Sequence, residues 1–118
     1  MAQKAEHLQK AQHNEDFSDC VATLDGPASF DDWEAVAIFY AALQLVDAKL
    51  ADHSIHPDNH AERFSAVHDQ FRMIWAEYSA LYNLAREARY KPEKDITASD
   101  VAKARNRWFP NIKAMCSS

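Results

Sequence analysis

The chain has 118 residues, a net charge of −5 and an apolar fraction of 47%, which fits a single domain, residues 1–118, with a core of its own. One glycine and few β-branched residues favour helix at most positions. No apolar run approaches the ~20 residues of a membrane span, and the polar N-terminus lacks the apolar stretch of a signal peptide, so we expect a cytoplasmic protein without membrane segments.

Residues 2–24 predict a first helix with one broad apolar side. The side chains expected on that side are Ala5, Leu8, Phe17, Val21 and Leu24. The sequence Asp25-Gly26-Pro27 is a turn signal that ends this helix. Ser29, followed three positions later by Asp32, resembles a capping box and predicts the start of the next helix.

The second predicted helix covers residues 31–52. Its apolar positions recur at alternating steps of three and four residues, as in a heptad seam. These positions are Val36, Phe39, Leu43, Val46 and Leu50, with Trp33 and Tyr40 widening the seam. Alanines between them allow a neighbouring helix to approach closely.

A third, uninterrupted helix is predicted from Asn59 to about Tyr90, after a histidine-rich loop at 53–58. Asn59 and Glu62 form an N-cap pair. The apolar positions again step by three and four: Phe64, Val67, Phe71, Ile74, Tyr78, Leu81, Ala85 and Ala88. At about 30 residues this helix would be ~45 Å long. The aromatic side chains of the two long helices form a stripe that is expected in the core, with part of it left for a dimer face. These side chains are Trp33, Phe39, Tyr40, Phe64, Phe71, Trp75 and Tyr78.

Pro92 ends the third helix, and Thr97 or Ser99 caps a fourth. The positions of that helix expected to face inward are Val101, Ala104 and Trp108. Pro110 must break or kink it, leaving a short final turn. The predicted fold class is therefore all-α: an antiparallel bundle of four main helices with a short C-terminal helical turn.

Charge is distributed unevenly along the chain. Residues 84–118 contain eight Lys and Arg against four Asp and Glu, whereas residues 1–83 contain five against fourteen. An acidic body argues against broad, nonspecific nucleic-acid binding. The basic C-terminal third is the region suited to phosphate, although its charges equally suit a solvated helix face.

Several familiar sites are missing from the sequence. One glycine allows neither a phosphate-cradling loop nor a dinucleotide fingerprint. There is no HExxH, and no Glu is followed by His three residues later, so a di-iron carboxylate bundle is unsupported. His53, His56 and His60 could approach a metal ion, but their spacing fixes no geometry. No metal and no cofactor is predicted.

The pair Arg63 and His68 is a candidate for catalysis. In metal-free RNA cleavage a His can move a proton at the 2′-hydroxyl or the leaving oxygen, and an Arg can stabilise charge on the phosphate. Five residues along a helix rotate a side chain by about 140°, so the two would point apart. A local kink or a partner subunit is needed to bring them together.

The start of the third helix is a candidate anion site. His60 and Arg63 share one helical face, His56 precedes them in the loop, and a helix N-terminus attracts negative charge. These three residues suit a phosphate. The structural alternative is that His60 and Arg63 bind loop carbonyls or Asp58.

The end of the third helix is a further candidate. Tyr82, Arg86 and Arg89 lie along one strip with Tyr90 beside them, and could stack on a base and pair with phosphate. The structural alternative is that they form salt bridges with neighbouring acidic residues and cap the helix C-terminus.

The two long helices resemble the HEPN family of small helical domains associated with RNA and nucleotides. The resemblance rests on AVAIFYAALQLVDAKLADH at 35–53, a loop ending in His60, and YSALYNLAREARY at 78–90. It implies long, continuous helices lying side by side and a homodimer. It also implies a role in toxin–antitoxin or antiviral defence systems, with a nucleotidyltransferase-like antitoxin as partner.

Many HEPN members are metal-independent endoribonucleases in which an Arg is followed by a His about a turn and a half later, which Arg63 and His68 match. The family has a polar residue after that Arg, whereas Phe64 stands here. Other branches keep a loop histidine and a terminal Arg-Tyr, which His60 and Arg89-Tyr90 match. We expect a HEPN-like domain that binds nucleotide, RNA or a partner protein without standard ribonuclease activity. The alternatives are a ribonuclease whose Arg63 and His68 meet across a dimer cleft, and a purely structural interaction module.

Overall fold

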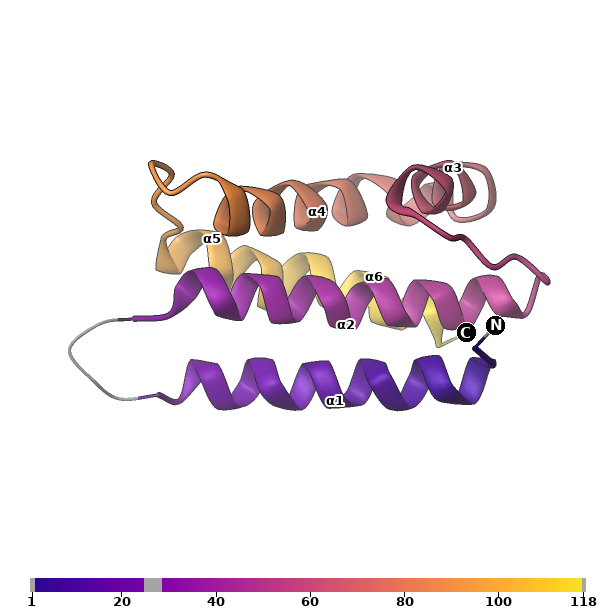
Figure 1. Ribbon diagram of the computed structural model, residues 1–118, viewed down its shortest axis with the longest axis horizontal. Helices are drawn as coiled ribbons and strands as arrows, with labels where there is room; N and C mark the ends of the chain where they lie inside the picture. The colour runs from indigo at the N-terminus through magenta and orange to yellow at the C-terminus, as the bar shows by residue number, and fades with distance from the viewer. Residues whose placement is uncertain (1, 25–28, 118) are drawn as a thin grey trace.

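The computed structural model describes residues 2–24 and 29–117, and within these ranges every regular element is helical (Figure 1). In chain order the elements are α1 (Lys4–Ala22), α2 (Asp31–Ala51), α3 (His60–Gln70), the 3₁₀ turn η1 (Arg72–Ile74), α4 (Trp75–Tyr90), α5 (Ala98–Lys103), the π-helical turn η2 (Ala104–Trp108) and α6 (Phe109–Cys116). The predicted all-α bundle is confirmed. None of the helices in the described ranges combines the length and apolar composition needed to cross a bilayer.

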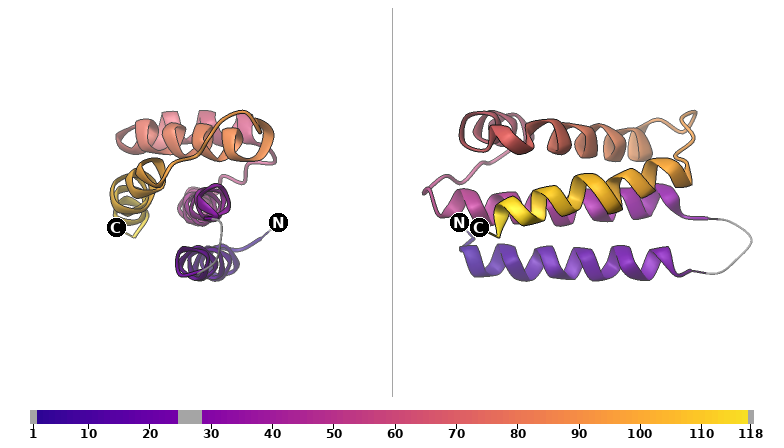
Figure 2. Two further views of the ribbon diagram at one scale, coloured as in Figure 1. Left: turned by 90° about the vertical axis from the view of Figure 1, so that its left-hand side faces the viewer. Right: turned by 180° about the vertical axis from the view of Figure 1, so that it is seen from behind.

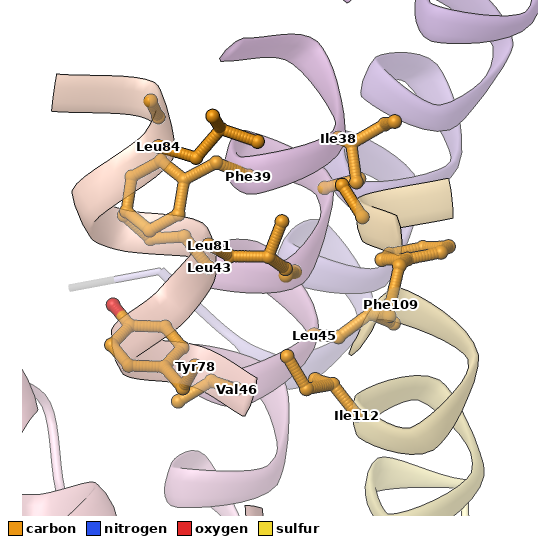
Figure 3. Close-up of a cluster of buried hydrophobic side chains, with 14 of the residues drawn as sticks. Ile38, Phe39, Leu43, Leu45, Val46, Tyr78, Leu81, Leu84, Phe109 and Ile112 are labelled. Atoms are coloured by element: carbon orange, nitrogen blue, oxygen red, sulfur yellow. The ribbon is translucent and has the colours of Figure 1, made fainter. Parts of the chain in front are cut away.

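α2 is the central helix, with α1 on one side and α4 and the C-terminal helices on the others (Figures 1 and 2). Because other helices surround it, α2 is buried along most of its length. All five predicted seam positions of α2 are buried. Figure 3 shows this seam region packed between Tyr78, Leu81 and Leu84 of α4 and Phe109 and Ile112 of α6.

The prediction of one uninterrupted helix from Asn59 to Tyr90 is wrong. The chain leaves the α-helix at Phe71 (φ −132°, ψ 51°) and resumes it at Trp75, after η1. Figure 1 shows α3 nearly end-on where α4 lies across the view. No Gly or Pro lies between residues 60 and 90, so the break has no local signal. Tertiary packing overrides helix propensity, since the break leaves Phe71 and Ile74 in the core.

Two of the predicted helix caps are confirmed. The side-chain oxygen of Asn59 accepts a hydrogen bond from the Glu62 N–H at 2.9 Å, at the start of α3. Thr97 accepts from the Asp100 N–H at 3.2 Å, at the start of α5. These bonds satisfy backbone donors that a helix leaves open at its N-terminus.

The predicted Ser29 cap is wrong. α2 begins at Asp31, with Phe30 in the capping position. The Ser29 hydroxyl instead donates to the Asp31 carboxylate at 3.3 Å, so it satisfies no backbone donor of the helix. The turn predicted at Asp25-Gly26-Pro27 lies outside the described residues.

Pro110 does not end the fourth helix, which continues from Ala98 to Cys116 (Figure 2). Because proline has no N–H to donate, the helix widens into the π-helical turn η2 just before it. Of the predicted break or kink, the described residues show a local change of hydrogen-bonding pattern and no break. The inward positions are as expected: Val101 and Ala104 are buried, and Trp108 packs against the core.

α1 faces α2 with its small side chains, which contradicts the predicted apolar side. The buried residues of α1 are Ala11, Ser18 and Val21. Of the predicted side, only Val21 is among them, whereas Leu8, Phe17 and Leu24 are exposed. Small residues let the two helix backbones approach closely, and this turns the larger side chains outward.

Trp33 is also not in the core as predicted. It is 55% exposed and lines a shallow apolar surface with Phe17, Leu24 and Phe30, at the end of the bundle where α1 and α2 meet. The aromatic stripe therefore divides, with Phe39 buried on one side of α2 and Trp33 left outside.

Polar contacts from Arg105 hold α1 against the other helices. From η2, Arg105 Nε donates to Glu34 of α2 at 2.9 Å. Its Nη1 donates to Asp19 of α1 at 2.7 Å, and its Nη2 donates to the Ser18 carbonyl at 3.0 Å. One guanidinium thus joins α1, α2 and the C-terminal helix.

We predict that Arg105→Ala lowers the free energy of unfolding by about 1–3 kcal/mol, because it leaves the buried Glu34 carboxylate without its cation. Urea denaturation followed by circular dichroism measures the loss. Arg107→Ala, which removes an exposed cation two positions along the same helix, is the matched control. Equal stability of the two variants would contradict the role given to Arg105.

Candidate functional site

A buried ion pair joins α2 to α3. Arg63 Nε donates to Asp47 Oδ1 at 2.7 Å, and Arg63 Nη2 donates to Oδ2 at 3.0 Å, the bidentate geometry of strong Arg–carboxylate pairs. The two side chains are only 9% and 8% exposed. A carboxylate buried on a central helix requires such a partner, because an unpaired buried charge is strongly unfavourable.

Tyr78 of α4 lies beside this pair, and its hydroxyl oxygen points away from Ile112 in Figure 3. Burial raises the pKa of Tyr78 well above its ordinary value, although the nearby Arg63 charge opposes this. Burial works against the charged form of Arg63, but the hydrogen bonds and charge of Asp47 outweigh it and raise the Arg63 pKa. Arg63 therefore stays a cation and Tyr78 a neutral phenol.

His60, the first residue of α3, lies beside the one guanidinium nitrogen of Arg63, Nη1, that is not bound to Asp47. Arg63 Nη1 is 3.4 Å from His60 Nδ1. The imidazole ring stands edge-on to Tyr82, with 5.3 Å between centroids, and is tilted against Phe39 at 6.2 Å. The ring is thus held by one residue from each of the three helices α2, α3 and α4.

The charge state of His60 follows from these neighbours. Burial lowers its pKa below the ordinary 6.5, and the positive charges of Arg63 and Arg89 lower it further, against an opposing effect of Asp47. His60 is therefore a neutral imidazole at neutral pH.

Arg89, near the end of α4, brings a second cation to His60. Its Nη1 donates to the Tyr40 hydroxyl of α2, and its Nε donates to the Ala85 carbonyl at 3.2 Å. The guanidinium carbon lies 5.4 Å from the centroid of the Tyr40 ring and 5.0 Å from that of Tyr90. No carboxylate in the described part of the chain pairs with Arg89.

We call His60, Arg89 and the rings of Tyr40, Tyr82 and Tyr90 the His60–Arg89 corner. A row of aromatic contacts fixes it across the break between α3 and α4. Phe64 stands edge-on to its three aromatic neighbours at 5.2, 5.4 and 4.6 Å, which are Trp75, Tyr78 and Tyr82. Such pairs contribute about 0.5–1.5 kcal/mol each beyond their burial.

Of the predicted ligand residues, Arg89 packs on Tyr90, and His60 lies near enough for the charge of Arg89 to lower its pKa, while Arg63 contacts His60 from within α3. Arg86 is exposed on α4, one turn before Arg89. His56 lines a neighbouring cavity of about 180 Å³, together with Asp47 and Asp58 among others. The predicted contact of His60 and Arg63 with Asp58 is replaced by the pair with Asp47.

His68 does not meet Arg63 within the chain. The His68 ring is exposed, lies edge-on to Trp75 at 5.4 Å and approaches the Asp69 carboxylate at 3.4 Å. A kink does occur, but it follows at Phe71. Since both residues precede it on the regular helix α3, the kink leaves their relative direction unchanged.

Within residues 2–24 and 29–117, no group of three or more His, Cys, Asp or Glu side chains is placed to hold a metal ion. The three histidines considered as metal ligands in the sequence have different neighbours. His53 lies edge-on to Phe71 at 5.6 Å, while His60 packs on Tyr82. His56 faces the cavity beside Asp47.

Sequence reasoning missed Asp47 and Tyr40 as parts of the site. Asp47 did carry a signal, because it is the one charged residue between positions 35 and 48 of an otherwise apolar helix. Such a residue predicts a buried partner. Tyr40 carried no such signal beyond its place on the seam.

Comparison of the chain with protein-family models, with curated proteins and with solved structures found no match in any of the three.

We predict that Arg63→Met and Asp47→Leu each lower the free energy of unfolding by about 3–5 kcal/mol, because each leaves one buried charge without its partner. The double variant should recover most of that loss, since it leaves no buried charge and fills a similar volume. Urea denaturation of all three variants measures this. If the double variant lost as much free energy of unfolding as the two single variants together, Arg63 and Asp47 would not be a coupled pair.

We also predict that His60 makes stability depend on pH. Because burial lowers its folded pKa below 6.5, the unfolded chain binds more protons as the pH falls through that range, and stability falls with it. Denaturation at about pH 7.5 and about pH 5.5 should show the loss, and His60→Gln should reduce the difference. His68→Gln, at an exposed histidine, is the control and should behave like the wild type.

Proposed function

We propose that this protein is a HEPN-like domain that binds a nucleoside phosphate, either a free nucleotide or part of a single-stranded RNA, at the His60–Arg89 corner without cleaving it. The observation that carries the proposal is the Arg89 guanidinium, set against two tyrosine rings with no carboxylate partner among the described residues. Arginine is suited to phosphate recognition, and the exposed Tyr90 ring is suited to stacking on a base.

The position of His60 supports the same proposal. His60 opens α3, and the first N–H groups of a helix favour a nearby anion. A phosphate between His60 and Arg89 would gain a hydrogen bond from one and a charge-assisted bond from the other. The acidic body of the chain would confine such binding to this corner.

The family resemblance is a separate support, and one observation weakens it. The break at Phe71 departs from the continuous helix that the resemblance implies, so the proposal rests on the corner more than on the family. The homodimer, the nucleotidyltransferase-like antitoxin partner, the toxin–antitoxin or defence role and the cytoplasmic location stay predictions from the sequence.

Ribonuclease action by Arg63 and His68 fits the geometry less well. Two N–H groups of the Arg63 guanidinium, on Nε and Nη2, are bound to Asp47 in a buried pair, and Nη1 lies 3.4 Å from His60, so a phosphate would have to compete with these partners to bind Arg63. A His68 supplied by a partner subunit would not change this, because Arg63 would still be bound to Asp47.

The other alternative, an interaction module, is favoured by the exposed apolar surface around Trp33.

We predict that a fluorescent ATP analogue or a labelled RNA octamer binds the wild type, and that Arg89→Gln and His60→Gln each weaken binding. Loss of a hydrogen bond to a charged group corresponds to about ten- to a hundredfold for Arg89, and a smaller change is expected for His60. Fluorescence anisotropy at low salt measures both.

Arg107→Ala, which removes an exposed cation outside the corner, should bind like the wild type, and circular dichroism should show all variants folded. Binding unaffected by Arg89→Gln, or no binding of either probe, would refute the proposed site. RNA incubated with the protein in EDTA should stay intact. Cleavage that disappears in His68→Ala would favour the ribonuclease alternative.

A further inference from the structure

We infer that Arg63 is a positioning residue, which holds His60 as the neutral tautomer with its proton on Nε2, so that the corner offers a hydrogen-bond donor at this position. The inference about the tautomer rests on geometry alone. Its consequence for the ligand rests on the proposed function.

Each of the three side-chain nitrogens of Arg63 has a partner. Nε and Nη2 are bound to the two oxygens of Asp47, which fixes the plane of the guanidinium. Nη1 is thereby directed at His60 Nδ1, 3.4 Å away. A guanidinium can only donate, so Nδ1 must accept. A neutral imidazole whose Nδ1 accepts carries its proton on Nε2.

The other protonation states of His60 are disfavoured by what faces it. A proton on Nδ1 would point at an N–H of Arg63. A doubly protonated ring would add a positive charge beside two others, Arg63 from α3 and Arg89 from α4, while Asp47 of α2 already serves Arg63. The tilted contact with Phe39 and the edge-on contact with Tyr82 restrict rotation of the ring.

The consequence is a division of roles at the proposed site. Arg89 supplies the positive charge, and His60 supplies a directed, uncharged N–H. Such a pair fits a phosphate oxygen held by one cation and one neutral donor. Arg63, predicted from the sequence as a phosphate ligand, does not touch the ligand and acts through His60.

Nuclear magnetic resonance of protein labelled with ¹⁵N-histidine tests the inference without any ligand. Long-range proton–nitrogen correlations at about pH 7.5 distinguish the tautomers, and His60→Gln assigns the signals. We expect His60 of the wild type to be the Nε2–H tautomer. A mixture, or the Nδ1–H form, would overturn the inference.

Two variants separate positioning from folding and from charge. In the double variant Asp47→Leu/Arg63→Met, which leaves no buried charge, His60 should become a mixture of tautomers and its pKa should move up toward 6.5. Arg63→Lys keeps the charge, but its single ammonium cannot hold Asp47 and His60 in the same fork. It should loosen the tautomer while the pKa of His60 stays low. A fixed Nε2–H tautomer in both variants would show that Arg63 is not responsible.

Binding of the fluorescent ATP analogue gives the readout for the ligand. If the corner is the site, the double variant should bind more weakly in proportion to the lost fraction of the Nε2–H tautomer, about twofold for an equal mixture. A wild type with the fixed tautomer that binds no probe would refute the proposed function and leave the inferred tautomer of His60 standing. Unchanged affinity despite a mixed tautomer would refute the consequence for the ligand.

Discussion

The buried pair between Asp47 and Arg63 is the constraint on which the rest of the structure depends. Asp47 sits on the central helix, where other helices cover it, and a carboxylate in that place must have a cation. Arg63 of α3 supplies it, and the chain leaves the α-helix at Phe71 before it enters α4.

The candidate site is assembled from three helices. Tyr40 comes from α2, His60 from α3 and Arg89 from α4, and each is anchored by contacts inside the bundle. The site is therefore built on regular elements, which hold side chains more rigidly than loops do. Without the break after α3, His60 and Arg89 would lie at distant points of one long helix, about 43 Å apart along its axis.

The sequence predicted where the helices lie along the chain better than it predicted how they pack against one another. Periodicity identified the buried side of α2, and the caps at Asn59 and Thr97 were readable because capping chemistry is local. The break at Phe71 had no local signal, since it is stabilised by contacts between helices. The orientation of α1 was missed because its buried positions are small or polar, such as Ala11 and Ser18, and hydrophobic patterns do not register them. Within the site, His60 and Arg89 were each recognised from the sequence, but the break that brings them to the same end of the bundle was not predicted.

The way α1 is attached has a consequence for the behaviour of the bundle. Its apolar contribution to the core is small, and polar contacts tie it down, including Lys113 with Glu15 at 2.9 Å, Arg105 with Asp19 at 2.7 Å, and His7 with Gln44 at 2.7 Å. Each of the two ion pairs, Lys113–Glu15 and Arg105–Asp19, has at least one solvent-exposed member. Dissolved salt therefore screens their attraction, with a screening length of roughly 10 Å at moderate salt. The burial of apolar side chains around α2 is not weakened by this screening. We therefore expect concentrated salt to weaken the attachment of α1 more than the packing of the helices around α2.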